Sequence, residues 1–331
     1  MAPMILLISW KCCNLMHGIT MRSKIFLLLL AVLCEQLPVS LYAADIDYPI
    51  ALLFSDNESV YQGPMKAFRT EIDHPVHVFN LQGDIKKDPT LKRRIFSTNP
   101  RLIFVLGAKA AFTAKLWTRE HQDIPVLFAL VLNWQRYKLM DQKNMAGIAG
   151  EIAPGTTFAN ITVFSPDIKR IGVIYSAHSE KALQQAKEAA EIFNIELYGK
   201  KINRSKDFKR SFKKLRGQVD AFLVLNDPVI YTLENMDWLK IRCIKEKLSC
   251  IGQSKNIVEH GLVLSINPDI ADIGSQAASI AKNIINRHQH TDYIGVMPPL
   301  GTQIIINRTT AKRIGLILHQ ASLDMATQVI D

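Results

Sequence analysis

The sequence alternates short apolar runs with amphipathic stretches, and this alternation limits the fold more than any other feature. The stretch that follows Ser179 shows the helical period, because Leu183, Ala186, Ala190 and Phe193 fall on one stripe. The apolar runs are continuous, as in strands that are buried on both faces. They occupy residues 50–54, 77–81, 102–106, 126–131, 146–150, 171–175, 195–198, 221–225 and 262–266. Such strands separated by helices predict an α/β fold with parallel sheets covered on both faces.

Two series of strands and helices follow one another along the chain. A length of 331 residues gives room for two domains. The pattern predicts two doubly wound parallel-sheet lobes, an N-terminal lobe at residues 45–151 and a C-terminal lobe at residues 152–297. We expect the final segment, about residues 298–331, to return to the N-terminal lobe and complete it. Several crossings between two lobes are typical of a hinge with an interlobe cleft, in which a ligand favours closure.

Residues 1–44 are predicted to be an upstream extension followed by a signal peptide. Arg22 and Lys24 form a positive region, and an apolar run follows at residues 25–33. The run of roughly nine residues is too short to span the roughly 30 Å of a bilayer core as a helix. Small residues then allow cleavage after Ala43 or Ala44. This order predicts export to the periplasm, with an uncleaved anchor helix as the alternative.

The start of the chain and its cysteines leave two questions open. A complete signal begins at Met21, so translation starts either there or at Met1. Cys34 lacks a good lipobox before it, so lipoprotein anchoring is not expected. Cys243 and Cys250 remain after cleavage and form no CxxC pattern. Because one is predicted to be helical and the other to begin a strand, we expect two buried thiols, with one bridge as the alternative.

The chain is basic, with a formal net charge of +10 that falls by two when residues 1–44 are removed. An exported protein rarely meets nucleic acid, and no helix-turn-helix or RNP-like pattern occurs, so we expect no nucleic-acid partner. The basic residues cluster between Lys200 and Arg216, where Phe208, Phe212 and Leu215 form one apolar helix face. The cluster is interpreted as the solvated face of that helix, and a docking patch for a membrane partner is the alternative.

Small, amide, acidic and aromatic residues follow the predicted strands in both series. Ligands of open parallel sheets bind outside the carboxyl ends of the strands, where loops lead into helix N-termini. The small-residue turn at Gly107 can offer free backbone N–H groups to an anionic ligand group. A small polar or amino-acid-like ligand would need groups of this kind from both lobes. The candidate ligand-binding residues are Ser55, Asn57, Gly107, Ala108, Asn133, Trp134, Tyr175, Asn226, Asp227 and Gln253.

Five segments of the chain form a recognisable series. They read RLIFVLGAKAA at 101–111, DIPVLFALV at 123–131, NMAGI at 144–148, PDIKRIGVIY at 166–175 and INRTTAKRIGL at 306–316. In this order they resemble the ABC transporter substrate-binding protein family that includes the tryptophan-type receptors. The resemblance implies a type I periplasmic-binding fold, a ligand held in the interlobe cleft and delivery to an inner-membrane permease with its ATPase. We expect a monomer that binds a small-molecule ligand.

The chain departs from this family at two loops where the ligand is expected. Residues 55–61 form a shorter and more acidic loop than the family's His-Pro-containing segment. Asn133 and Trp134 replace the usual Asp-Pro after the strand at 126–131. The family's fold can therefore be carried over to this chain better than the family's preference for aromatic amino acids.

The sequence lacks the motifs of common enzymes. It contains no GxSxG, P-loop, GxGxxG, HExxH or CxxC pattern. The close histidine pairs, His74 with His77 and His288 with His290, have no nearby cysteine or clear carboxylate set. We therefore expect no catalytic residue, metal or cofactor. Two alternatives remain: a periplasmic sensor or adaptor of the same fold that signals through a membrane partner, and an exported hydrolase with an unrecognised site.

Overall fold

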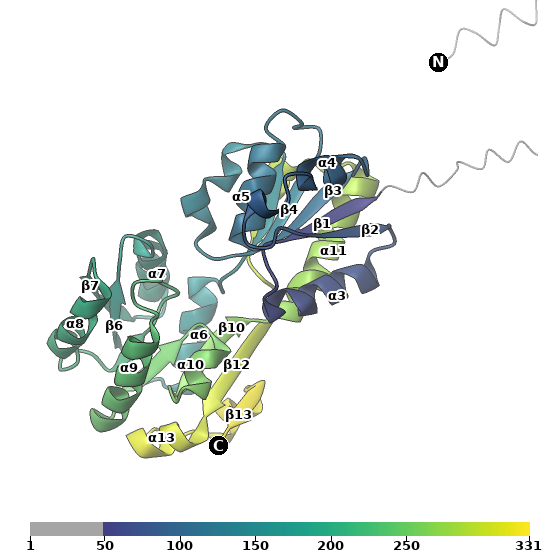
Figure 1. Cartoon of the computed structure of the whole chain (residues 1–331). Helices are drawn as coiled ribbons and strands as arrows, with labels where there is room; N and C mark the ends of the chain where they lie inside the picture. Colours follow the sequence, from purple (N-terminus) through teal and green to yellow (C-terminus); the bar gives the residue numbers. More distant parts are fainter. Residues whose placement is uncertain (1–48) are drawn as a thin grey trace, which may run out of the picture. The chain divides into compact units, whose positions relative to one another are not determined.

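A computed structural model describes residues 49–331 of the chain (Figure 1). The predicted signal peptide and Cys12, Cys13 and Cys34 lie outside the described residues. Within the described range, no helix combines the length and the apolar character needed to cross a membrane.

The first sheet has six strands in the order β11-β5-β4-β3-β1-β2, and every neighbouring pair is parallel. Its strands are β1 (Ile50–Phe54), β2 (Val76–Asn80), β3 (Leu102–Leu106), β4 (Val126–Val131), β5 (Met145–Ala149) and β11 (Val296–Met297). Its helices are α3 (Gln62–Glu71), α4 (Leu91–Phe96), α5 (Ala108–Trp117), α11 (Ile270–Arg287) and α12 (Thr291–Ile294).

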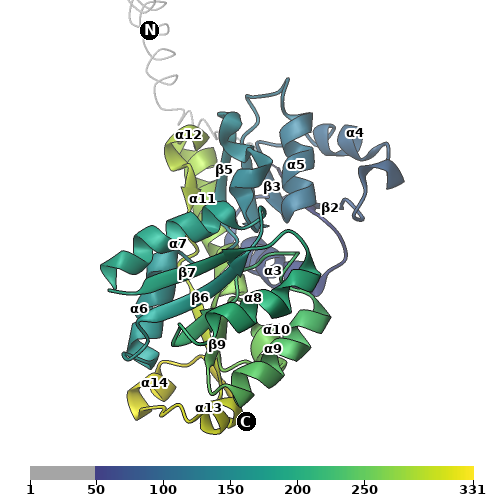
Figure 2. The same cartoon turned by 90° about the vertical axis from the view of Figure 1, so that its left-hand side faces the viewer.

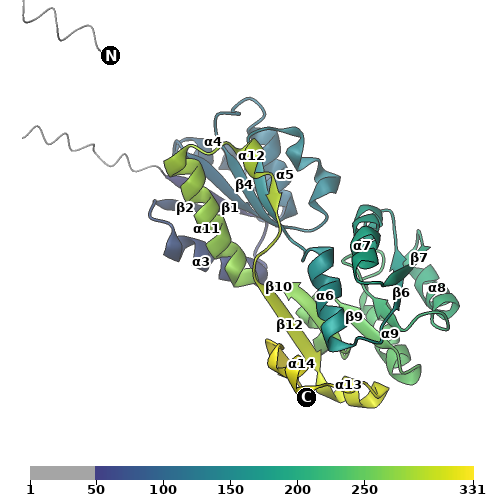
Figure 3. The same ribbon diagram turned by 180° about the vertical axis from the view of Figure 1, so that it is seen from behind.

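Both faces of this sheet are buried along its central strands β1, β3 and β4, which are apolar at every position. Successive residues of a strand point to opposite faces. Leu52 of β1 packs in a cluster with α3 and α11, and its neighbour Leu53 packs in a second cluster with α4 and α5. Helices α3 and α11 lie side by side although far apart in sequence (Figures 1 and 3). They approach so closely at Gly274 that a Cβ there would clash with the backbone of Pro64.

The second sheet has seven strands in the order β13-β12-β10-β9-β8-β6-β7. Its strands are β6 (Arg170–Tyr175), β7 (Glu196–Lys201), β8 (Ala221–Leu223), β9 (Ser249–Gly252), β10 (Leu264–Pro268), β12 (Thr302–Asn307) and β13 (Gln328–Ile330). Its helices are α6 (Pro154–Phe164), α7 (Glu180–Ile192), α8 (Phe208–Leu215), α9 (Leu233–Lys245), α10 (Lys255–Glu259), α13 (Arg308–Ile314) and α14 (Gln320–Asp324).

Helices cover both faces of the second sheet as well (Figure 2). Val173 of β6 packs in a cluster with α6, α7 and α13, and Ile174 packs in a cluster with α8, α9 and α10. The buried side of α8 carries Phe208, Phe212 and Leu215, as predicted, while most of its lysines and arginines are exposed. The predicted α/β fold of two largely parallel, doubly covered sheets is confirmed.

The position of the C-terminal segment differs from the prediction. Strand β12 pairs with β10 of the second sheet, antiparallel, with Leu264 opposite Ile306. The segment that joins the first sheet is instead residues 270–297, through α11, α12 and β11. The apolar run of β12 is compatible with either sheet, and only the strand with which it pairs determines which sheet it joins. The placement of residues 298–331 in the N-terminal lobe was therefore wrong, while the domain boundary near residue 151 stays a prediction.

Cys243 and Cys250 also differ from the expectation of two buried thiols. Cys243 near the end of α9 is disulfide-bonded to Cys250 in β9, with a Cα–Cα distance of 6.1 Å. This distance lies within the range that a disulfide requires. The short turn between helix and strand brings them together, because the Leu248 N–H donates to the Cys243 carbonyl at 2.9 Å.

Three short segments connect the two sheets. They lie between β5 and α6, between β10 and α11, and between β11 and β12, at residues 150–153, 269 and 298–301. Short multiple connections of this kind are the places where hinge motion between domains is absorbed.

Candidate functional site

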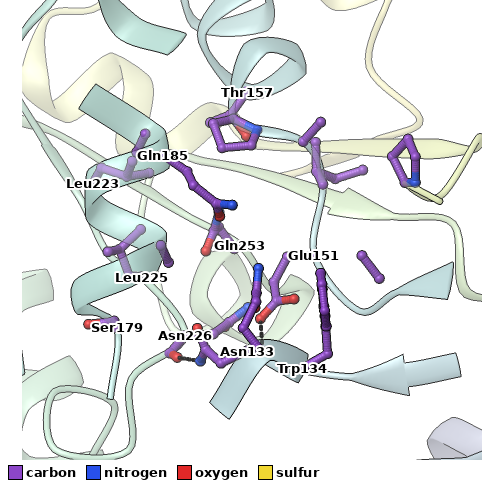
Figure 4. Close-up of a pocket in the computed structure, with 18 of the residues that line it drawn as sticks. Asn133, Trp134, Glu151, Thr157, Ser179, Gln185, Leu223, Leu225, Asn226 and Gln253 are labelled. Atoms are coloured by element: carbon purple, nitrogen blue, oxygen red, sulfur yellow. Dashed lines mark hydrogen bonds between the residues drawn. The ribbon is translucent and has the colours of Figure 1, made fainter. Parts of the chain in front are cut away.

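A pocket of about 310 Å³ is lined by residues that follow strands of both sheets (Figure 4). Its apolar lining includes Trp134, Phe158, Leu223 and Leu225. Its polar lining consists of Asn133, Gln135, Glu151, Thr157, Ser179, Gln185, Asn226 and Gln253. An apolar cavity of this size with a few polar groups suits a small molecule.

Asn133 joins three parts of the pocket. It is the second residue after β4 and adopts a left-handed conformation with φ of 48°, which asparagine tolerates better than most residues. Its backbone N–H donates to Glu151 Oε1 at 2.6 Å, and its side-chain Nδ2 donates to the Asn226 carbonyl at 3.2 Å. The ring of the next residue, Trp134, lies 6.4 Å from that of Phe128 between centroids. These contacts fix where the indole borders the pocket.

Glu151 is the acidic group of the pocket. It comes two residues after the end of β5 and lies on the connection to α6. Burial raises its pKa from the ordinary 4.5 to about 7, although the hydrogen bond from the Asn133 N–H opposes the rise. The carboxyl group therefore changes its charge near neutral pH.

Asp227 hydrogen-bonds to Ser179, one of the residues that line the pocket. Its side chain is 1% exposed. Oδ2 accepts hydrogen bonds from the Ser176 N–H at 2.9 Å, from the Ser176 hydroxyl at 2.7 Å and from the Ser179 hydroxyl. Oδ1 accepts a bond from the Val229 N–H at 2.8 Å. Burial alone would raise the pKa of Asp227, but these hydrogen bonds outweigh it and hold the pKa below its ordinary value.

One buried hydroxyl in the pocket has no partner. Thr157, in the first turn of α6, is 2% exposed, and its Oγ1 makes no hydrogen bond to any residue that the structure describes. A buried hydroxyl of this kind destabilises the folded protein unless a hydrogen-bond partner reaches it.

In residues 49–331, no group of three or more His, Cys, Asp or Glu side chains is placed to hold a metal ion.

A model of the ABC transporter substrate-binding protein family matches residues 61–330. The chain belongs to this family. It is 23% identical over 245 residues to a tyrosine-binding protein of Clostridioides difficile (strain R20291), which covers 72% of this chain and 69% of the relative.

Solved structures show the same fold. A ligand-free, open substrate-binding protein with adhesive properties from Clostridium difficile superposes with a TM-score of 0.72 at 19% identity, over 86% of this chain and 99% of its own. An ABC domain from Streptococcus pneumonia in complex with L-Trp gives 0.59 at 20% identity, over 85% of this chain and 100% of its own. The fold is thus the type I periplasmic-binding fold that the resemblance implied.

Four of the predicted ligand-binding residues come together in the pocket: Asn133, Trp134, Asn226 and Gln253. They come from the loops after β4, β8 and β9, so the rule that ligand groups follow parallel strands brought them together. Their contact with a ligand stays a prediction.

Three predicted residues near the first strands do not line this pocket. The Ser55 hydroxyl donates to the Leu106 carbonyl at 3.1 Å and accepts the Ala110 N–H at 3.0 Å. Gly107 has a φ of 89° and precedes Ala108, the first residue of α5. Ser55 therefore occupies one of the backbone N–H groups at the start of this helix, and the anion-binding role of the turn stays a prediction.

Three further predicted residues also contact their own chain. The side chain of Asn57 accepts a hydrogen bond from Asn80, and Tyr175 packs at the edge of the second sheet's core. Asp227 faces Ser176 and Ser179 and is not among the pocket-lining residues. Its direct contact with a ligand stays a prediction, and its hydrogen bonds add the supporting role described above.

Sequence reasoning missed several lining residues, and Glu151 is the most important. It follows an apolar run directly, so the strand-end rule that found Asn133 would also have found it. Ser179 was detectable as the residue before a helix. Gln185 and Thr157 lie inside helices, and no local pattern distinguishes them from residues that face solvent.

Proposed function

We propose that this chain is the exported solute-binding receptor of an ABC-type importer. It holds a small polar or amino-acid-like ligand in the pocket and delivers it to an inner-membrane permease. The pocket carries this proposal, because polar groups and an indole from both sheets surround one small-molecule cavity. The three connections between the sheets support closure around a ligand. The receptor acts as a monomer and does not transform what it binds.

The relatives indicate where the search for a ligand should begin. One is named a tyrosine-binding protein, and another was solved in complex with L-Trp. Aromatic amino acids therefore belong in the first panel. Small amides, sugars, amines and oxyanions complete it, since Asn133 and Trp134 stand where the family has Asp-Pro.

Ligand binding is expected to raise the thermal stability of the purified protein. A ligand at about 100 times its dissociation constant adds about 2.7 kcal/mol to the free energy of unfolding. Replacing Trp134 by alanine should weaken that ligand roughly tenfold or more, because the indole is the largest side chain of the pocket. Thermal shift and calorimetric titration measure the two effects.

Tyr293→Ala provides the matched control, because this aromatic residue is 82% exposed and does not line the pocket. It should bind the ligand as the unaltered protein does. A broad panel in which nothing stabilises the protein would reject the receptor role and favour a sensor or adaptor that recognises another protein.

Export is supported by two observations of different kinds. Residues 21–44 have the order of a cleavable signal, and Cys243 and Cys250 are bonded, as is common in an oxidising compartment. We expect the protein recovered from the periplasm of an expressing bacterium to begin at Ala44 or Asp45. N-terminal sequencing checks this, and an intact N-terminus on protein retained in the cytoplasm would contradict it.

A further inference from the structure

The pocket has a charge opposite to that of the whole chain. The chain has a formal net charge of +10. Among the residues of the described part that line the pocket, Glu151 is the only Asp, Glu, Lys, Arg or His. A ligand in this cavity therefore meets one acidic group and no basic side chain.

Within the part of the chain that the structure describes, only one oxygen of the Glu151 carboxyl group has a hydrogen-bond partner. Oε1 accepts the Asn133 N–H at 2.6 Å, which is a short, charge-assisted geometry. No group within residues 49–331 donates a hydrogen bond to Oε2. Figure 4 shows this second oxygen pointing away from Asn133. A carboxylate has room for about four hydrogen bonds, so most of its accepting capacity is unused.

The carboxyl group is largely but not fully buried, and an ionised carboxylate with so few protein partners in such a place destabilises a protein. Acidic side chains with strongly shifted pKa values concentrate at functional sites. There, a bound ligand can supply the hydrogen-bond donors that the protein itself does not provide. A protonated amine would donate to Oε2 and neutralise the charge in surroundings of low dielectric constant, where the attraction is strong.

We propose that Glu151 recognises a cationic nitrogen, and that the receptor's ligand is a small amine with an apolar body and no required carboxylate. This inference rests on the proposed receptor function and specifies its ligand. Trp134, Leu223 and Leu225 provide the apolar surface for the body of such a ligand. The unpartnered Thr157 hydroxyl provides one neutral polar contact, which a hydroxyl or carbonyl group can use.

Matched sets of compounds test this class. Each set shares one side chain and differs in charge: tryptamine, tryptophan and indole-3-propionate; phenethylamine, phenylalanine and 3-phenylpropanoate; isopentylamine, leucine and 4-methylpentanoate. Within the set that binds best, the amine should bind at least as tightly as the amino acid. It should bind at least about tenfold more tightly than the acid, because one ion pair of this kind contributes about 1.4 kcal/mol or more to the binding free energy, and this corresponds to a factor of ten in affinity. Calorimetric titration provides the dissociation constants.

Two variants separate recognition from general charge. Glu151→Gln should weaken the amine about thirtyfold or more, because truncating a buried charged partner costs at least about 2 kcal/mol. Glu191→Gln, at an exposed position of α7, removes the same charge and should leave the affinity unchanged.

The pH dependence gives an independent readout. Among residues 49–331, Glu151 is the only titratable side chain that lines the pocket, and its pKa of about 7 means that the ionised fraction rises roughly thirtyfold from pH 5.5 to pH 8. Alkyl amines stay protonated over this range, so the affinity for the amine should rise by a comparable factor. In Glu151→Gln this rise should disappear.

Three results would overturn the inference. In the first, an acid or an amino acid binds more than tenfold tighter than the amine of its set. In the second, the amine binds Glu151→Gln and the unaltered protein with equal affinity, and in the third, the best ligand from the broad panel is a neutral or anionic compound. In each of these cases the receptor function itself survives, because a ligand still binds. A panel without any ligand would instead reject the proposed function.

Discussion

At pH 8, replacing Glu151 by glutamine is expected to increase the free energy of unfolding of the ligand-free protein by up to about 3 kcal/mol. Burial raises the pKa of this carboxyl group from 4.5 to about 7. The gap between these two values corresponds to at most about 3 kcal/mol by linkage. Glutamine keeps the shape and can still accept the Asn133 N–H bond without carrying a charge.

The gain should depend on pH with a definite sign. Below about pH 4.5 the folded and unfolded states both hold the proton, so the ionisation of Glu151 has no effect on stability. Between 4.5 and about 7 the unfolded state releases its proton while the folded state retains it, and the native protein loses stability as the pH rises. Above about 7 the loss is complete.

Urea unfolding at several pH values measures this effect. The difference between Glu151→Gln and the unaltered protein should be small near pH 4.5 and largest at pH 8. The exposed Glu191→Gln variant of α7 should show no such change with pH. A constant difference at all pH values would mean that the substitution acts through packing and not through ionisation.

The strands were predictable because each buried run carries its own signal. Residues 102–106 are apolar at every position, which indicates a strand with both faces covered, and β3 occupies these residues. Which sheet a strand joins was harder to predict. Residues 304–306 have the same apolar character, yet they pair with β10 and not with a strand of the first sheet. Register and neighbours depend on distant contacts that no local pattern contains.

The site was partly predictable for the same reason. Asn133, Asn226 and Gln253 follow strands, so their position in the chain indicates the ligand edge of a sheet. The sequence cannot say which of two polar neighbours faces the cavity. Asn226 lines the pocket, whereas Asp227 turns toward Ser176 and Ser179.

This difference leads to the second large expected effect, at Asp227. Replacing it by alanine should reduce the free energy of unfolding by about 3 to 5 kcal/mol, since it removes the acceptor of four hydrogen bonds. The Ser176 and Ser179 side chains are 2% and 1% exposed, so water does not readily replace the lost acceptor. Urea unfolding at pH 7 gives the magnitude, and Asp237→Ala at an exposed position of α9 is the control.

The charge of Asp227 should matter as much as its shape. Hydrogen bonds hold its pKa below the ordinary 3.8, so its stabilising contribution is present above about pH 3.8 and is lost as the pH falls through the folded-state pKa. The difference in stability between the Asp227→Ala variant and the unaltered protein should therefore narrow as the pH falls below about 3.8. The loop that Asp227 holds also presents the Asn226 carbonyl to Asn133, so the variant should bind ligand more weakly at temperatures where it is still folded. A variant with normal ligand affinity would show that the hydrogen bonds of Asp227 stabilise the second sheet without positioning the pocket.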